Sequence, residues 1–284
     1  MIMLSSTYSM SAISDSPIID PKSRFHPVYS RAGMVVSQEV IASRIGADIL
    51  ALGGNAVDAA VATGFALAVT LPRAGNLAGG GFMLIHLTRE SKTIALDFRE
   101  VAPARASRDM FLNLHGEVDN QLARSSIKSS GVPGTVAGLL HAHEKYGQLP
   151  LKQVIQPAID LASKGIIVNV DLAHSIVSRA KRLTKNSATK KYYFKSSDEF
   201  YKPGDTLVQT DLADTIRRIA ADGHAGFYEN KTAKLIVEEM IRSGGLITLD
   251  DLKNYRVVER KPICVDYQAK NICSMPPPSS GGVH

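Results

Sequence analysis

Apolar residues between Ile41 and Leu52 recur three to four positions apart, which is the spacing of one helix face, and a pair of glycines follows them. This spacing predicts a helix that ends at the glycines. The apolar run 34–36 just before it predicts a short strand, and Ser37 between the two is a candidate helix cap. A strand followed by a helix is therefore expected where the folded region begins.

The next stretch, 56–71, consists mostly of small and aliphatic residues. Asn55 can cap a helix here, with Asp58 at its third position. Because a helix that is apolar all round must be buried, we expect this one at the centre of the fold. Its apolar run, 59–71, is too short for the ~20 residues that a bilayer span needs.

Two strand-like runs follow, 82–87 and 93–99, and the polar residues between them suit a hairpin loop. Successive residues of a strand face opposite sides. Arg99 therefore lies on the side away from the apolar residues of the second run, together with Asp97.

After Pro103 the pattern is predominantly helical. The candidate helices, separated by Gly, Pro or polar turns, are 135–146, 151–164, 171–185, 211–222 and 230–243. Thr248 and Asp251 resemble a capping box, which gives that carboxylate a structural role. The section 257–275 predicts a hairpin. Strands, then a helical array, then strands again indicate an α+β or layered domain, since the βαβ units of a doubly wound fold are lacking.

The composition is that of a globular chain with a large core. Of its 284 residues 44% are hydrophobic and 21% are charged, and this length favours one large domain. We divide the chain into a flexible lead-in, 1–30, which is rich in Ser and Pro, and a domain over 31–284. The lead-in lacks the basic start and apolar run of an export signal.

The net charge is +6, from 33 basic and 27 acidic residues, and this excess is too small to indicate nucleic-acid binding. The densest basic region, 179–195, also holds aromatic side chains, a mixture that polynucleotide grooves use. We favour a solvated helix end and loop for this region, because the wider charge signal is weak.

The chain has two cysteines, Cys264 and Cys273, which excludes a disulfide scaffold and a four-cysteine metal site. A two-residue turn at Gln268 and Ala269 sets the cysteines opposite each other on adjacent strands. A disulfide is then conceivable in an oxidising compartment, whereas two partly buried free thiols are the interpretation we favour.

A glycine loop, 75–82, is the first candidate for chemistry. It follows a helix and opens a strand, whereas a dinucleotide fingerprint follows a strand and opens a helix. Gly79, Gly80 and Gly81 can bring the backbone close to a ligand with N–H groups pointing inward. A tight turn without a ligand is the alternative.

Arg99 is the second candidate. A guanidinium at the end of a strand can bind a carboxylate through two parallel hydrogen bonds, and Asp97 on the same face can hold it in place. A structural salt bridge between Arg99 and a nearby acid is the alternative, and the residues alone favour it.

Other catalytic signatures are weak. Two S-x-x-K matches, at 125–128 and 178–181, lack their companion elements. His141 and His143 stand two apart on a helix and point to different sides, which argues against a metal site. We assign no catalytic residue and no metal ligand within these residues.

Five runs of the chain carry a resemblance. They are GGNAVDAA (53–60), GNLAGGGF (75–82), DFREVAP (97–103), GVPGT (131–135) and MPPPSSGG (275–282). In this order they resemble the large-subunit portion of γ-glutamyltranspeptidases, also called glutathione hydrolases, and the similarity extends from about Phe25 to the last residue.

The resemblance implies an α+β fold of the N-terminal nucleophile hydrolase superfamily, an αββα sandwich of which this chain holds an incomplete, large-subunit part. It implies a precursor that cuts itself into two subunits, and a new N-terminal Thr that attacks the γ-glutamyl carbonyl of glutathione or a related amide. No metal or organic cofactor is required. Water or an acceptor amine then takes the acyl group, so hydrolysis and transfer both stay open.

Carried onto this sequence, the resemblance makes Arg99 the arginine that grips the substrate α-carboxylate, which reverses the preference stated above. It places the loop with Gly79, Gly80 and Gly81 near the pocket, with Ala78 where the family often has Gly. None of the Thr residues lies in the family's nucleophile motif, so we expect the chain alone to be inactive and the small subunit to complete it.

Two further questions stay open. The alternative to an enzyme part is a non-catalytic fragment that binds a separately encoded small subunit, or an inactive remnant. The resemblance implies a periplasmic or extracellular location, whereas the lack of a visible export signal implies the cytoplasm if the start is correct.

Overall fold

The computed structural model describes residues 28–196 and 199–283. The residues from Gly33 to His284 form one compact unit. Most of the predicted lead-in, 1–30, lies outside the described residues, so that part of the domain division stays a prediction. Within the part of the chain that is described, no helix combines the length and the apolar character that a membrane span requires.

A three-stranded antiparallel sheet contains the predicted hairpin. Strands β1 (Phe82–Leu87) and β2 (Lys92–Asp97) pair with Phe82 opposite Asp97, and β5 (Val258–Arg260) pairs with the other side of β2. The order is therefore β1-β2-β5, with β2 in the centre and the other two strands at the edges. The hairpin predicted from the sequence is confirmed, and β5 adds a strand from the far end of the chain.

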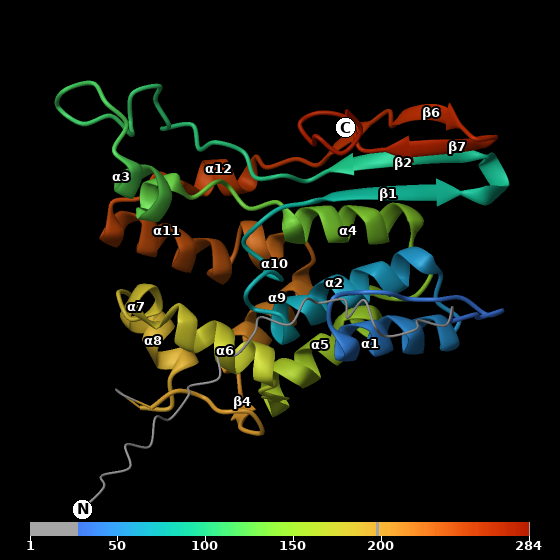
Figure 1. Cartoon of the computed structure of the whole chain (residues 1–284), viewed down its shortest axis with the longest axis horizontal. Coiled ribbons are helices and arrows are strands. Elements are labelled where there is room, and N and C mark those ends of the chain that lie inside the picture. Colours follow the sequence, from blue (N-terminus) through green and yellow to red (C-terminus); the bar gives the residue numbers. More distant parts are fainter. Residues whose placement is uncertain (1–27, 197–198, 284) are drawn as a thin grey trace, which may run out of the picture. The chain divides into compact units, whose positions relative to one another are not determined.

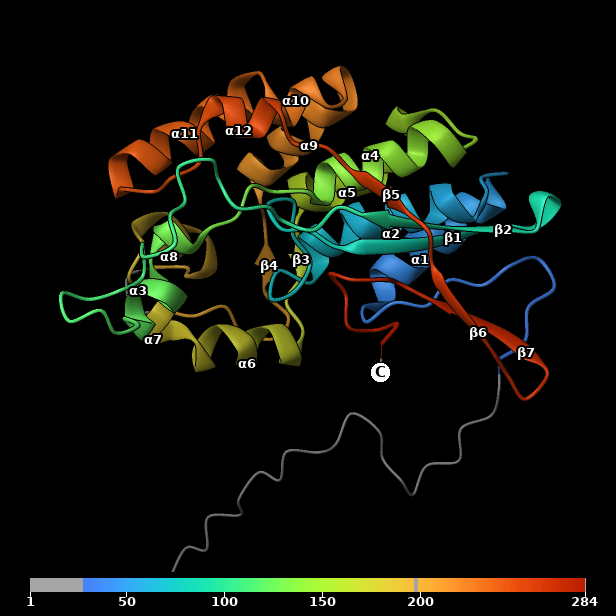
Figure 2. The same cartoon turned by 90° about the horizontal axis from the view of Figure 1, so that it is seen from above.

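Four helices form the layer beside this sheet. They are α1 (Val40–Ala51), α2 (Ala56–Thr70), α4 (Thr135–Tyr146) and α5 (Leu151–Lys164). Helix α2 contacts the other three, and α4 also contacts β2. Figures 1 and 2 show the β1–β2 hairpin between α4 and the C-terminal hairpin. The predicted central helix is confirmed, because Val61, Phe65 and Val69 of α2 are fully buried.

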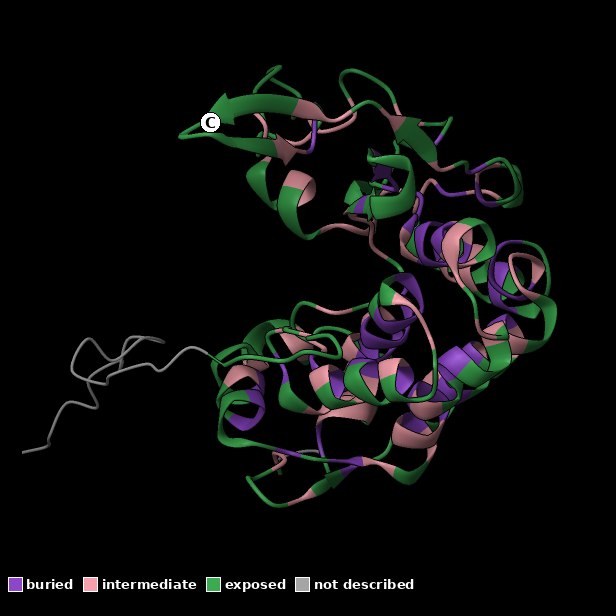
Figure 3. Ribbon diagram, turned by 90° about the vertical axis from the view of Figure 1, so that its right-hand side faces the viewer, coloured by how far each residue is buried: buried purple, intermediate pink, exposed green. Residues whose placement is uncertain are grey.

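A second group of helices completes the unit. They are α3 (Asn120–Ser125), α6 (Val170–Ser178), α7 (Ala180–Leu183), α8 (Ser187–Tyr193), α9 (Thr210–Asp222), α10 (Ala225–Tyr228), α11 (Lys231–Ser243) and α12 (Leu249–Lys253). Two short strands, β3 (Ile166–Ile167) and β4 (Thr206–Leu207), pair with each other. Figure 3 shows buried residues concentrated on the sides where helices face one another. The predicted helix 171–185 is broken at Arg179 into α6 and α7.

The C-terminal hairpin consists of β6 (Ile263–Tyr267) and β7 (Lys270–Ser274). Its turn residues, Gln268 and Ala269, have φ values of 45° and 57°, as a two-residue hairpin turn requires. Cys264 lies opposite Cys273, as the turn predicts. The two are joined by a disulfide, so the preference for free thiols is wrong. The register brings the sulfur atoms together, and register alone does not determine whether they are oxidised.

The predicted start of the folded region is partly wrong. Residues 34–36 form no strand, and Val36 is 82% exposed. Helix α1 is capped by Glu39 rather than Ser37, because a carboxylate oxygen of Glu39 accepts a hydrogen bond of 2.8 Å from the Ala42 N–H. Ser37 instead donates its hydroxyl to the Glu39 carbonyl, at 2.8 Å. A run of three apolar residues is too short to specify a strand without a partner.

Candidate functional site

Three of the five motif runs meet at the end of β2. Gly81 and Phe98 exchange two backbone hydrogen bonds, of 3.2 and 3.0 Å, which extend the β1–β2 ladder by one pair. The Gly79 carbonyl accepts from the N–H groups of Gly134 and Thr135, at 2.6 and 2.9 Å. These two donors stand at the N-terminus of α4, where backbone N–H groups lack helical partners. The glycine loop thus joins the sheet to the start of α4.

The glycines of the loop are required by close packing within the chain. A Cβ atom on Gly80 would lie 2.6 Å from the Glu100 nitrogen and 2.7 Å from the Phe98 carbonyl oxygen. Close packing within the chain therefore accounts for these glycines without a ligand. The N–H groups of Gly79 and Gly80 donate no hydrogen bond to any described residue, and their predicted role beside a ligand stays a prediction.

Arg99 lies two residues after the end of β2 and is exposed. Its guanidinium forms no ion pair with a described residue, and its one hydrogen bond there is a long one of 3.5 Å from Nη1 to the Pro278 carbonyl. Pro278 belongs to the run 275–282, so a fourth motif lies beside this side chain. The alternative of a structural salt bridge at Arg99 finds no partner among the described residues.

Asp97 does not hold the Arg99 side chain, so that prediction is wrong. One carboxylate oxygen of Asp97 accepts the backbone N–H of Arg99 at 3.0 Å, and the other accepts the Nε–H of Arg260 at 2.8 Å. Arg260 lies on β5, opposite Ala95, two residues before Asp97 on β2. The neighbouring strand therefore supplies the cation that the sequence alone could not place.

Tyr255, which follows α12, also contacts Arg99. Its hydroxyl donates a hydrogen bond of 2.9 Å to the Arg99 carbonyl. Burial raises the pKa of Tyr255, and the charges of Asp97 and Glu100 act in the same direction. The hydroxyl therefore keeps its proton and remains a donor at physiological pH. Sequence reasoning missed both Tyr255 and Arg260, since neither lies in a recognisable motif.

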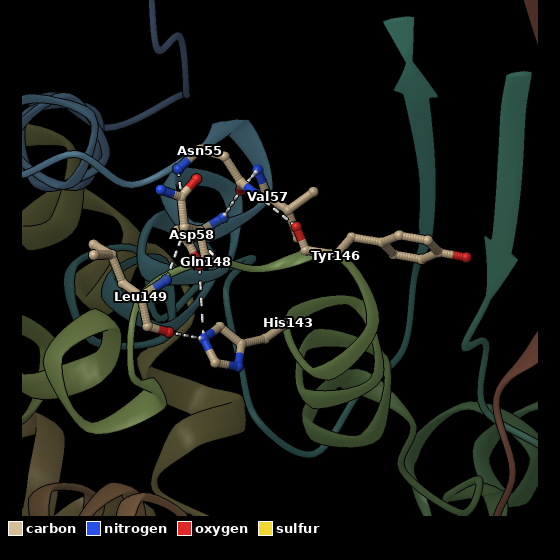
Figure 4. Close-up of polar contacts among 7 residues, drawn as sticks. All are labelled: Asn55, Val57, Asp58, His143, Tyr146, Gln148 and Leu149. Carbon is tan, nitrogen blue, oxygen red and sulfur yellow. Dashed lines mark hydrogen bonds and ion pairs between the residues drawn. The ribbon is translucent and has the colours of Figure 1, made fainter. Parts of the chain in front are cut away.

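The motif run 53–60 lies in a different place and has a structural role. The Asp58 side chain is fully buried and accepts backbone N–H groups of Asn55 (2.9 Å), Gln148 (3.0 Å) and Leu149 (3.3 Å). Figure 4 shows these contacts, with His143 between the Leu149 carbonyl at 2.8 Å and Asp58 at 3.6 Å. Asp58 thereby completes the capping box with Asn55 at the start of α2 and fixes the connection between α4 and α5.

The predicted capping box at the start of α12 is confirmed. Thr248 accepts from the Asp251 N–H, and Asp251 accepts from the Thr248 N–H, at 3.1 and 2.8 Å. Asp251 also accepts the Ala104 N–H at 2.8 Å, so this carboxylate is structural. His141 pairs with Glu259 at 3.0 Å. Within the described residues, no group of three or more His, Cys, Asp and Glu side chains is arranged to hold a metal ion.

One cavity borders the glycine loop. It has a volume of about 490 Å³, and its lining includes Gly75, Ala78, Tyr192 and Phe227. Arg99 is not among the lining residues. Within the described residues, the Arg99 guanidinium therefore lies on the surface and outside this cavity.

Comparison with known proteins identifies relatives along most of the chain. The family model described as gamma-glutamyltranspeptidase matches residues 42–284. The glutathione hydrolase proenzyme of Escherichia coli is 51% identical over 260 residues, which cover 92% of this chain and 45% of that protein. The chain thus spans about half the length of the curated relatives it matches.

Two solved structures of gamma-glutamyltranspeptidases are also similar to this chain. The gamma-glutamyltranspeptidase of Helicobacter pylori aligns with a TM-score of 0.88 and 46% identity, over 90% of this chain and 73% of that chain. The gamma-glutamyltranspeptidase of Pseudomonas nitroreducens, complexed with L-DON, aligns with a TM-score of 0.83 and 41% identity, over 90% of this chain and 74% of that one.

Proposed function

The chain belongs to the gamma-glutamyltranspeptidase family, and we propose that it supplies the carboxylate-binding part of a site that transfers or hydrolyses γ-glutamyl groups. Its fold is confirmed as α+β, part of the αββα sandwich of N-terminal nucleophile hydrolases. The proposed substrates are glutathione and related γ-glutamyl amides.

The guanidinium of Arg99, which forms no ion pair with a described residue, carries this proposal. It is exposed where four motif runs converge, while Asp97, two residues before it in the chain, is already paired with Arg260. A planar guanidinium binds a carboxylate through two parallel hydrogen bonds, which fix both the position and the orientation of the anion. The α-carboxylate of a γ-glutamyl group is such an anion, and its binding would place the γ-carbonyl at a fixed distance from Arg99.

The reaction itself needs a nucleophile from outside these 284 residues. We propose that the hydroxyl of a Thr at a new N-terminus attacks the γ-carbonyl, with its own α-amine as the base. The amine of the substrate leaves with a proton, and a γ-glutamyl ester remains on the enzyme. Water or an acceptor amine then breaks the ester and regenerates the hydroxyl. The contribution of this chain is to bind and orient the glutamyl end, with the N–H groups of Gly79 and Gly80 nearby.

The partner in this proposal is the polypeptide that carries the Thr, either the small subunit of the same precursor or a separately encoded remainder. The edge strand β1 supports it, because β1 pairs on one side only within the described residues and its Leu84 is 41% exposed. Unpaired edges of this kind are normally covered or paired. Additional strands on β1 would extend the sheet toward the complete sandwich.

We propose a location outside the cytoplasm. The Cys264–Cys273 disulfide supports it, since structural disulfides persist mainly in oxidising compartments.

A chimeric proenzyme tests the proposed function. Residues 42–284 replace the matching stretch of the Escherichia coli glutathione hydrolase proenzyme, and release of anilide from a γ-glutamyl anilide is measured. The chimera is expected to cleave itself and to turn over the substrate, whereas the chain alone is expected to show no turnover. A chimera that folds and cleaves itself but releases no anilide contradicts the proposal and favours a non-catalytic role.

A further inference from the structure

The main chain of Arg99 is held on both sides by buried side chains. Its N–H donates to Asp97 at 3.0 Å, and its carbonyl accepts from the Tyr255 hydroxyl at 2.9 Å. The preceding residue, Phe98, is fixed by its two backbone hydrogen bonds with Gly81. The backbone is therefore constrained up to and through the residue that carries the guanidinium.

The two groups that hold Arg99 are themselves fixed. Asp97 is 7% exposed and pairs with Arg260, and Tyr255 is 4% exposed. The Tyr255 ring stacks on Tyr228 with a centroid distance of 5.9 Å and an interplanar angle of 11°. A Cβ on Gly134 would overlap the Tyr255 hydroxyl, so this glycine leaves the space through which the hydroxyl reaches Arg99.

Beyond its main chain, the Arg99 side chain has little support among the described residues. Its one hydrogen bond to a described residue is the long one to the Pro278 carbonyl, at 3.5 Å. A long side chain that is held loosely loses rotamer entropy when it binds an anion. The direction in which the side chain leaves the backbone therefore depends on the two hydrogen bonds to the Arg99 peptide groups, which limit the volume that the guanidinium can search.

We propose that Asp97 and Tyr255 are positioning residues, which clamp the main chain of Arg99 and thereby aim its guanidinium at the substrate carboxylate. This inference rests on the proposed function, because it assumes that Arg99 binds that carboxylate. Neither residue touches the substrate. Their effect passes through Arg99 and is exerted on binding rather than on the chemical step.

The matched control is Tyr228. Its hydroxyl also donates to a backbone carbonyl at 2.9 Å, that of Pro133, and it too is buried. Tyr255→Phe and Tyr228→Phe therefore remove the same group from neighbouring stacked rings, and only the first removes a hydrogen bond to Arg99. Asp97→Asn serves as the conservative variant of the second positioning residue, because its amide oxygen can still accept the Arg99 N–H.

The first test is a double-mutant cycle in the chimera. Tyr255→Phe is expected to raise KM for a γ-glutamyl anilide about three- to tenfold, as the loss of one hydrogen bond allows, with kcat changed less than twofold. In an Arg99→Ala background the same substitution is expected to change KM by less than twofold. Asp97→Ala is expected to raise KM and Asp97→Asn to restore most of the affinity. Tyr228→Phe is expected to leave KM within twofold.

The second test uses the full 284-residue chain without ligand. Amide hydrogen exchange in the segment 98–103 is expected to accelerate at least about threefold in Tyr255→Phe and to stay unchanged in Tyr228→Phe. If Arg99→Ala leaves KM unchanged, the proposed function fails. If Arg99→Ala raises KM but the effect of Tyr255→Phe persists undiminished in that background, or exchange in 98–103 does not respond, the clamp is overturned and the proposed function stands.

Discussion

The guanidinium of Arg260 binds the carboxylate of Asp97 with 2.8 Å between Nε and Oδ2, whereas Arg99, two residues further along the chain, forms no ion pair with a described residue. Both oxygens of Asp97 are occupied, one by Arg260 and one by the backbone N–H of Arg99. A buried carboxylate needs such partners, since its desolvation is costly. Arg260 therefore has a structural role in the ion pair between β5 and β2, whereas Arg99 is available to bind an anion.

Arg260→Ala tests whether the ion pair between Arg260 and Asp97 stabilises the fold. The substitution leaves the Asp97 carboxylate, whose side chain is 8% exposed, without its cation. We expect the free energy of unfolding to fall by about 1–3 kcal/mol, measured by urea denaturation. Arg108→Ala is the control, because the Arg108–Asp109 pair is 97% and 71% exposed and such pairs contribute at most about 1 kcal/mol. Equal losses in both variants would contradict the role assigned to Arg260.

Asp58→Asn tests the buried junction between α2 and the α4–α5 connection. The carboxylate accepts N–H groups from its own helix cap and from residues 90 positions away. An amide offers one acceptor oxygen in place of two and turns an NH₂ group toward the remaining donors. We expect a loss of about 2–3 kcal/mol in the free energy of unfolding. Asp250→Asn, on the exposed side of α12, is expected to cost less than about 0.5 kcal/mol; similar losses would refute the assignment.

The buried tyrosines predict how stability depends on alkaline pH. Burial raises the pKa of Tyr228 and of Tyr255 above the value of about 10 in an unfolded chain. The contribution of these two tyrosines to the free energy of unfolding is fully present below about pH 10. Above it the unfolded chain loses these protons first, so stability falls as pH rises.

Denaturation of the wild-type chain and of the double variant Tyr228→Phe/Tyr255→Phe, between pH 8 and 11, measures this effect. We expect the fall in the free energy of unfolding above about pH 10 to be shallower in the double variant, because the two ionisations are absent. Identical slopes in the two proteins would show that the hydroxyls titrate freely in the folded state.

The C-terminal hairpin predicts the outcome of a thiol titration. Cys264 and Cys273 are joined by a disulfide, so the denatured chain is expected to react with no equivalents of thiol reagent before reduction and with two afterwards. Cys264→Ser gives the control, in which one thiol reacts in both conditions. Two reactive thiols in the unreduced wild-type chain would restore the free-thiol interpretation and remove the support for an oxidising compartment.

The sequence predicted those elements whose signals are local. The bounds of α4 and α5 agree with the predicted 135–146 and 151–164, and the capping boxes at Asn55 and Thr248 are present. Each depends on residues within a few positions, so periodicity and capping chemistry suffice. The same holds for the hairpin turn that sets Cys264 opposite Cys273.

The contacts that build the candidate site could not be predicted in this way. Tyr255 binds the Arg99 carbonyl from 156 positions away, and Arg260 binds Asp97 from 163. The sequence around each of these two residues has no local pattern that marks it as part of the site. The role of Arg99 stays a prediction, whereas the expected contact between the Asp97 and Arg99 side chains is wrong, because the partner of Asp97 depends on how β5 pairs with β2.

The Michaelis constant of the Arg99→Lys chimera for a γ-glutamyl anilide tests the central claim most directly. Lysine keeps the charge but loses the planar, two-pronged geometry, so we predict that KM rises by about 10- to 100-fold. The exposed substitution Arg108→Lys, measured alongside, is expected to leave KM unchanged. A KM for Arg99→Lys equal to that of the unsubstituted chimera would contradict the assignment of Arg99 as the carboxylate-binding residue.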